Sequence, residues 1–356
     1  MNINKKYISI LSVAATILLS ACSSDDSGAQ NNTTDNTPVG VKMQVKTFSS
    51  FFADPGPTAV PDPTGFSPYT PDKRTIMGVY MLLSENLPAD WTDPTEKSIT
   101  YSDKWHAYFE VAADKTYTVY GYMPKTGDMG STLTKTTANA ATLNITGIKP
   151  VTTDDVCIIT GVKDTNVGLK EGQFSWYTPV GVDTYYINIL MDHLYAAVMF
   201  SMKIDAEYAN LRTIKVKQME LSTDKGSVKA TISLTHNDTG ASPVTGVTYT
   251  PSGSSYTAEI FSSEEGTALD KKTPLVINSC FAPTLSNNLT LVTTYDVYDS
   301  KDNLIRQNCT ATNKLPNLEA VRAQRVQVNM TVNPTYLYVL SEPDLDNPTI
   351  KLKIDN

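Results

Sequence analysis

The stretch LYAAVMFSMKI, residues 194–204, alternates with a period of two. Its one face carries Leu194, Ala196, Val198, Phe200, Met202 and Ile204. Successive side chains of a strand point to opposite faces of a sheet, so this spacing places all six apolar side chains together. The pattern predicts a half-buried β-strand.

The same alternation recurs along most of the chain, for example in TYTVYGYM (116–123), YYINILM (185–191) and VQVNMTV (326–332). Turn-forming clusters such as THNDTG (235–240) and YDSKDN (298–303) separate these runs, and only short helices such as residues 318–324 are expected. Many short strands without alternating helices predict an all-β protein of antiparallel sandwiches. The length suffices for two domains, expected at residues 39–195 and 196–356.

The first residues have the order of a secretory signal peptide: Lys5 and Lys6, an apolar run, and then small residues. LSAC, residues 19–22, resembles a bacterial lipobox, in which the cysteine receives lipid and cleavage occurs before it. We therefore expect a lipoprotein signal peptide over residues 1–21 and lipidation of Cys22. The alternative is an ordinary signal peptide with an incidental cysteine. Residues 22–38 are polar and predict a flexible tether.

The net charge of −8 and the scattered basic residues argue against nucleic acid as a partner. Among the remaining cysteines, Cys280 and Cys309 could form a disulfide in an oxidising compartment, which would leave Cys157 over. Equally, all three could be small buried hydrophobes.

No constellation of catalytic or metal-binding residues stands out in the sequence. Its three histidines have neither a second histidine nor a cysteine at metal-ligand spacing, so no metal site is expected, and His193 is predicted to be partly buried and satisfied. DLDNP (344–348) resembles a calcium loop only faintly. We expect no catalytic residue, no cofactor and no enzymatic activity. A glycan-binding face built from tryptophan and tyrosine is the alternative from the binding class.

The two ends of the mature chain share one pattern. VGVKMQVKTF (39–48) alternates Val41, Met43 and Val45 with polar residues, and TIKLKID (349–355) alternates Ile350, Leu352 and Ile354 with lysines. These are two edge strands that carry lysine against aggregation, or a removable strand and a donor strand that can replace it.

A single arginine follows the first strand. It is Arg74, the first arginine of the chain, directly after the proline-rich loop 53–71. An arginine-specific protease that cuts between Arg74 and Thr75 would release Cys22 together with the first strand.

In order along the chain, these features resemble the fimbrillins of Bacteroidales type V pili. The resemblance also rests on IMGVYML (76–82), YFEVAADKTYTVYGYMP (108–124), and the runs at 186–204, 211–234 and 322–350. It implies two tandem Greek-key, transthyretin-like β-sandwich domains and export to the outer-membrane surface.

The resemblance further implies cleavage by an arginine-specific protease and head-to-tail polymerisation by donor-strand exchange with other copies or related fimbrial subunits. The proline-rich loop between the first strand and Arg74 departs from the family pattern. An uncleaved lipoprotein that acts as a pilus anchor, a tip adhesin or a glycan- or host-binding module is therefore the alternative.

Overall fold

A computed structural model of the chain describes residues 39–48, 76–83, 95–101, 105–111, 116–137, 140–163, 174–175, 185–235, 244–283, 289–316, 318, 321–335 and 342–355. The described chain is built of strands, and its one described helix is the single 3-10 turn η2, Tyr208–Asn210. The predicted all-β class is confirmed. The short helix expected at 318–324 is wrong for the residues described there, which form a turn that ends in the left-handed Ala323.

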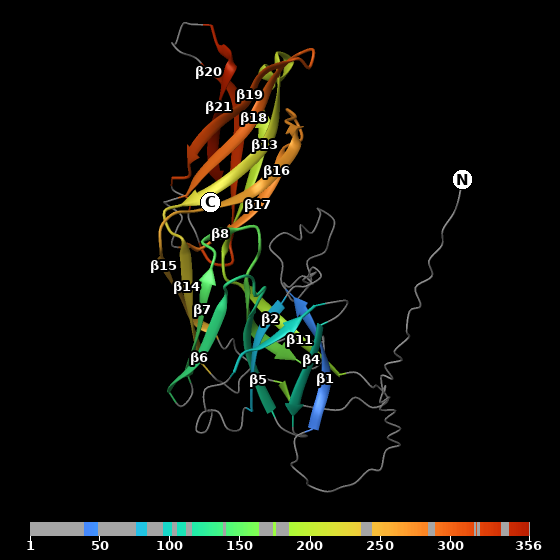
Figure 1. Cartoon of the computed structure of the whole chain (residues 1–356), viewed down its shortest axis with the longest axis vertical. Coiled ribbons are helices and arrows are strands. Elements are labelled where there is room, and N and C mark those ends of the chain that lie inside the picture. The colour runs from blue at the N-terminus through green and yellow to red at the C-terminus, as the bar shows by residue number, and fades with distance from the viewer. Residues whose placement is uncertain are drawn as a thin grey trace, which may run out of the picture. The chain divides into compact units, whose positions relative to one another are not determined.

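Four sheets contain the described strands (Figure 1). Sheet A has the order β3 (Lys97–Thr100), β2 (Ile76–Leu83), β5 (Thr116–Met123), β9 (Cys157–Lys163), β11 (Tyr185–His193), β1 (Val39–Phe48), β4 (Trp105–Val111), with β10 (Phe174–Ser175) beside β5. Sheet B has the order β15 (Val244–Ser252), β14 (Ser227–Thr235), β7 (Ala140–Ile148), β6 (Gly130–Thr137).

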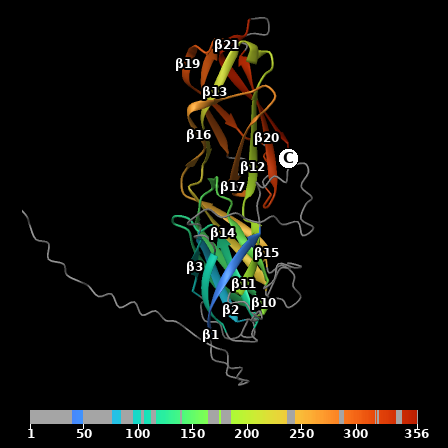
Figure 2. The same ribbon diagram turned by 90° about the vertical axis from the view of Figure 1, so that its right-hand side faces the viewer.

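Sheets C and D contain the rest. Sheet C has the order β21 (Asp344–Asp355), β20 (Arg325–Thr335), β12 (Ala196–Ile204), β17 (Leu275–Phe281), β8 (Val151–Thr152). Sheet D has the order β16 (Tyr256–Ala268), β13 (Arg212–Thr223), β18 (Thr290–Asp299), β19 (Leu304–Lys314). Figure 2 shows β12, β17 and β20 of sheet C together.

The strand predicted at residues 194–204 is present as β12, which begins at Ala196. Ala197 on its other face is also buried, and the alternation holds from Val198 onward. Phe200 and Met202 are fully buried, and Lys203 is exposed. A phenylalanine side chain removed from water contributes roughly 1.5–3 kcal/mol. Apolar side chains of β12, β13, β18 and β20 belong to one core cluster.

The alternation changes phase once within β13. Ile214 and Val216 are buried on one side of the change, and Met219 and Leu221 on the other. The pairing of β13 with both of its neighbours shifts between Val216 and Gln218, which marks a β-bulge. The extra residue in the bulge reverses which positions face the core, from even-numbered to odd-numbered residues. The apolar side chains after the bulge therefore lie on the same face of the sheet as those before it.

Two strand pairs depart from the antiparallel prediction, and all other described pairs follow it. β1 runs parallel to β11, and β12 runs parallel to β20. On its other side β1 is antiparallel to β4, and β12 is antiparallel to β17. The two strands therefore have matching neighbours in sheets A and C.

The division into domains 39–195 and 196–356 stays a prediction. β14 and β15 lie beyond residue 195 in the chain, yet they pair with β7 in sheet B. Likewise, β8 lies before residue 195 and pairs with β17 in sheet C. Two sheets thus contain strands from both sides of the predicted boundary.

Cys280 and Cys309 do not form the possible disulfide. Cys280 lies in β17 of sheet C, and Cys309 lies in β19 of sheet D. Cys280 is fully buried, as the alternative of a small hydrophobe predicts.

Candidate functional site

The last strand, β21, lies at the edge of sheet C, where it pairs with β20 alone among the described strands. Ile350, Leu352 and Ile354 stand opposite Val332, Met330 and Val328 of β20. Ile350 is buried, Leu352 and Ile354 are half-buried, and the lysines between them are exposed. The predicted alternation of this strand is therefore present, and its removal would leave the β20–β12 pairing in place.

The beginning of β21 is held more firmly than the rest. The Arg212 guanidinium donates to Asp346 Oδ1 from Nε at 3.0 Å and from Nη2 at 2.7 Å. The buried Tyr208 hydroxyl donates to the Leu345 carbonyl at 2.5 Å, and burial raises the pKa of that hydroxyl. Both donors therefore meet one carboxylate oxygen in a charge-assisted pair, which is stronger than a hydrogen bond between neutral groups. Residues 344–348, which resemble a calcium loop faintly, are thus the anchored base of the strand.

Asp344 shapes the turn at this base. Its Oδ1 accepts a hydrogen bond from the Asp346 backbone N–H at 3.0 Å, and its Oδ2 accepts one from the Asn347 amide. These bonds, that of Asn347 first, hold the pKa of the half-buried Asp344 below its usual value. Beyond the base, the Asn313 amide of sheet D donates to the Ile350 carbonyl at 3.2 Å.

The first strand, β1, is an interior strand of sheet A. Residues 43–48 pair with β11, and residues 39–45 pair with β4. The interpretation of β1 as an edge strand is therefore wrong, whereas β21 does lie at an edge. If β1 left, backbone N–H and C=O groups on both β11 and β4 would lose their partners, and only another strand could replace them all.

Val41, Met43 and Val45 fall at alternate positions of β1, opposite Phe109, Ala107 and Trp105 of β4. Cys22, Arg74, Thr75 and the proline-rich loop 53–71 lie outside the described residues. Lipidation at Cys22 and cleavage after Arg74 therefore stay predictions.

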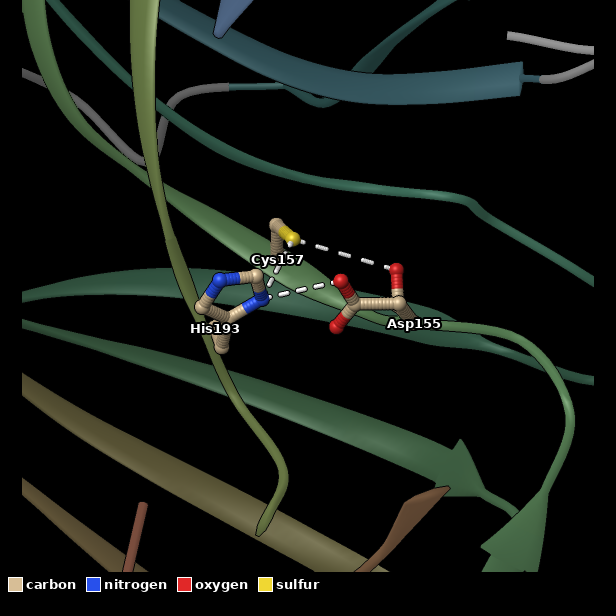
Figure 3. Close-up of side chains that lie close together, drawn as sticks. All are labelled: Asp155, Cys157 and His193. Atoms are coloured by element: carbon tan, nitrogen blue, oxygen red, sulfur yellow. Dashed lines mark hydrogen bonds and ion pairs between the residues drawn. The ribbon is translucent and has the colours of Figure 1, made fainter. Parts of the chain in front are cut away.

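One buried cluster was missed by the sequence analysis. Asp155, Cys157 and His193 converge at the junction of β9 and β11, where Cys157 and His193 are directly opposed across the two strands (Figure 3). His193 Nδ1 lies 2.8 Å from Asp155 Oδ2 and 3.7 Å from Cys157 Sγ. The side chains of His193 and Asp155 are 14% and 8% exposed, and Cys157 is fully buried. The expectation that no histidine would meet a cysteine rested on spacing along the chain, and the strand pairing overturns it.

The cluster does not have the geometry of a nucleophile–base–acid triad. Such a triad needs the thiol at one ring nitrogen of the histidine and the carboxylate at the other. In this cluster both groups approach the same atom, His193 Nδ1. The imidazole therefore cannot relay a proton from Cys157 to Asp155.

Structural comparison identifies similar folds in Bacteroides. The chain is similar to a fimbrial protein from Bacteroides vulgatus, at 12% identity and a TM-score of 0.35, over 88% of this chain and 98% of that one. It is also similar to candidate cell adhesion proteins from Bacteroides fragilis (10% identity, TM-score 0.42, covering 89% and 97%) and Bacteroides ovatus (13%, 0.40, covering 90% and 96%).

The structural neighbours of this chain are fimbrial and cell adhesion proteins. No protein-family model matches the sequence, and no curated protein does. Among the described residues, no helix is long and apolar enough to cross a membrane.

Proposed function

We propose that this protein is a structural subunit of a cell-surface fimbria and that it polymerises by donor-strand exchange. It is exported as a lipoprotein through Cys22 to the outer membrane, and an arginine-specific protease then cuts after Arg74. The cut releases β1, and β21 of a neighbouring subunit enters the place that β1 leaves between β11 and β4. Repetition of this step gives a head-to-tail filament of identical or related subunits.

The observation that carries the proposal is the match between an edge strand and an interior strand. Val41-Lys42-Met43-Gln44-Val45 of β1 and Ile350-Lys351-Leu352-Lys353-Ile354 of β21 have the same order of apolar and polar positions, with a lysine at the same place. A strand added to a sheet gains affinity from backbone hydrogen bonds and specificity from alternate side chains. β21 therefore offers both the backbone groups and the alternating apolar side chains that the place of β1 requires.

The positions of the two strands also support the exchange. β21 pairs with one neighbour, so it can leave sheet C at a limited cost, while its base stays tied to the body through Arg212 and Asp346. β1 pairs with two neighbours, so its replacement restores hydrogen bonds on both sides. In the exchange, β21 would lose hydrogen bonds to one neighbouring strand and gain hydrogen bonds to two.

The test is a variant that lacks residues 349–356, compared with Leu352→Lys and with the control Lys351→Gln. Loss of residues 349–356 should abolish filaments in electron micrographs of cells, while the purified chain keeps its β-sheet circular dichroism. Leu352→Lys puts a charge on the apolar face and should reduce filaments strongly, whereas Lys351→Gln changes an exposed position and should leave them intact. Filaments of normal abundance from the truncated chain would refute the donor role of β21.

The second candidate, an uncleaved surface lipoprotein that acts as an anchor, a tip adhesin or a glycan- or host-binding module, is favoured by the proline-rich loop between β1 and Arg74. It predicts a mature protein that keeps lipidated Cys22 and β1. It also predicts binding to a surface target that survives the deletion of residues 349–356.

A further inference from the structure

Asp155, Cys157 and His193 present three different donor atoms to one point in space. The donor atoms of the three side chains lie within 4.8 Å of one another, and Figure 3 shows the sulfur and the carboxylate on the same side of the imidazole ring. A thiolate, an imidazole nitrogen and a carboxylate oxygen are the three ligand types that zinc takes in proteins.

Hydrogen bonding satisfies only part of this cluster. The Cys157 thiol donates to the Asp155 backbone carbonyl at 3.8 Å, and His193 Nδ1 pairs with one carboxylate oxygen of Asp155 at 2.8 Å. However, Asp155 Oδ1 is buried and has no hydrogen-bond partner, which is costly for a carboxylate whose side chain is 8% exposed. A cation at the point of convergence would serve all three side chains at once.

The distances are close to those of a tetrahedral zinc site. Zinc–sulfur and zinc–nitrogen bonds of about 2.3 and 2.0–2.1 Å place sulfur and nitrogen about 3.6 Å apart in a tetrahedron. The observed separation of Cys157 Sγ and His193 Nδ1 is 3.7 Å. The corresponding nitrogen–oxygen separation is about 3.4 Å, so the Asp155 carboxylate, 2.8 Å away, needs a small outward rotation.

We propose that Asp155, Cys157 and His193 bind a Zn²⁺ ion, with the fourth position taken by water. On binding, the S–H bond of Cys157 breaks, its proton leaves to solvent, and the sulfur bonds to zinc, with no change of oxidation state. The hydrogen that His193 Nδ1 shares with Asp155 is lost from Nδ1, and the imidazole takes the tautomer protonated at Nε2, so that the Nδ1 lone pair bonds to zinc. The thiolate and the carboxylate together balance the charge of the ion. The proposal does not depend on the proposed function.

The position of the site would let zinc join two neighbouring strands. His193 ends β11, and Leu194 and Tyr195 lead directly into β12. The backbone there is already bound on both sides, because Leu194 N–H donates to the Val156 carbonyl at 2.7 Å and Arg322 Nη1 donates to the His193 carbonyl at 2.9 Å. Zinc would tie the end of β11, which pairs with β1, to the start of β9.

The test is a titration of the full chain, purified in detergent with a reducing agent and freed of metal by a chelator. Zinc competition with a coloured chelator should give one tight site per chain and a higher Tm. Cys157→Ser, His193→Gln and Asp155→Asn should each weaken binding by about tenfold or more, since each removes a ligand. The matched control is Cys309→Ser, a free thiol in β19 that should leave the affinity unchanged.

Cobalt replaces zinc in a second measurement that needs no ligand variant. In the Cys309→Ser background, cobalt should produce the near-ultraviolet absorption band of a cobalt–thiolate bond. Cys280 is fully buried in β17 and is not part of the cluster. No tight zinc binding, zinc binding that all three ligand variants leave unchanged, or cobalt binding without the thiolate band would each overturn the proposal.

Discussion

β1 and β12 occupy matching places in two different sheets and differ in how the chain holds them. Each runs parallel to one neighbour and antiparallel to the other. β12 continues from β11 through Leu194 and Tyr195, which are 0% and 1% exposed. β1 is separated from β2 by residues 49–75, which include Arg74. A single cut after Arg74 would therefore end the covalent link between β1 and β2, whereas β12 follows directly from β11.

The largest expected effect is the loss of filaments when the cut after Arg74 is blocked. Arg74→Ala should abolish filaments and leave a lipidated precursor, because β1 stays covalently joined to the body and keeps its place in sheet A. Electron microscopy of the cells and immunoblots of the membrane fraction measure both results. The matched control is Lys73→Ala, which removes the neighbouring positive charge and should leave filaments normal. Filaments of unchanged abundance from Arg74→Ala would contradict the account.

The next largest effect is on the free energy of unfolding, to which β12 and β1 should contribute differently. Phe200→Ala in β12 leaves a cavity in a fully buried site and should lower the free energy of unfolding by about 3–5 kcal/mol, whether or not the chain has been cut. Met43→Ala in β1 should lower it only in the uncut chain. Urea titrations of the Arg74→Ala chain and of the mature subunit test both. If the mature subunit also loses stability on Met43→Ala, β1 has not left it.

The smallest expected effect is at the base of β21. Folded-state hydrogen bonds hold the pKa of Asp344 below its usual 3.8. The stabilising contribution is therefore fully present above pH 3.8, and it is lost as the pH falls through the lower folded pKa. Asp344→Asn should lower Tm slightly at pH 7, and this difference should disappear toward pH 2. A difference that grows on acidification would contradict the assigned direction.

The strands themselves could be predicted from the sequence, because alternation reports which face of each strand is buried. Val198, Phe200 and Met202 of β12 are buried as that pattern requires, and so is Ile350 of β21. What alternation does not report is which strand lies beside which. The parallel pairs β1–β11 and β12–β20 and the interior position of β1 follow from long-range pairing.

The other features that the sequence did not predict also depend on how the strands pair. Cys157 and His193 are 36 residues apart, and only the register of β9 with β11 brings them together. The bulge at 216–218 preserves an apolar face across a break in alternation, which a fixed period cannot anticipate. Cys280 and Cys309 both lie in strands, but those strands belong to different sheets, so their proximity in sequence was misleading.

The mass and amino-terminal sequence of the subunit in purified surface filaments test the central claim most directly. The account predicts a chain that begins at Thr75, without lipid and without β1. A filament subunit that begins at lipidated Cys22 and still contains residues 39–48 would contradict it.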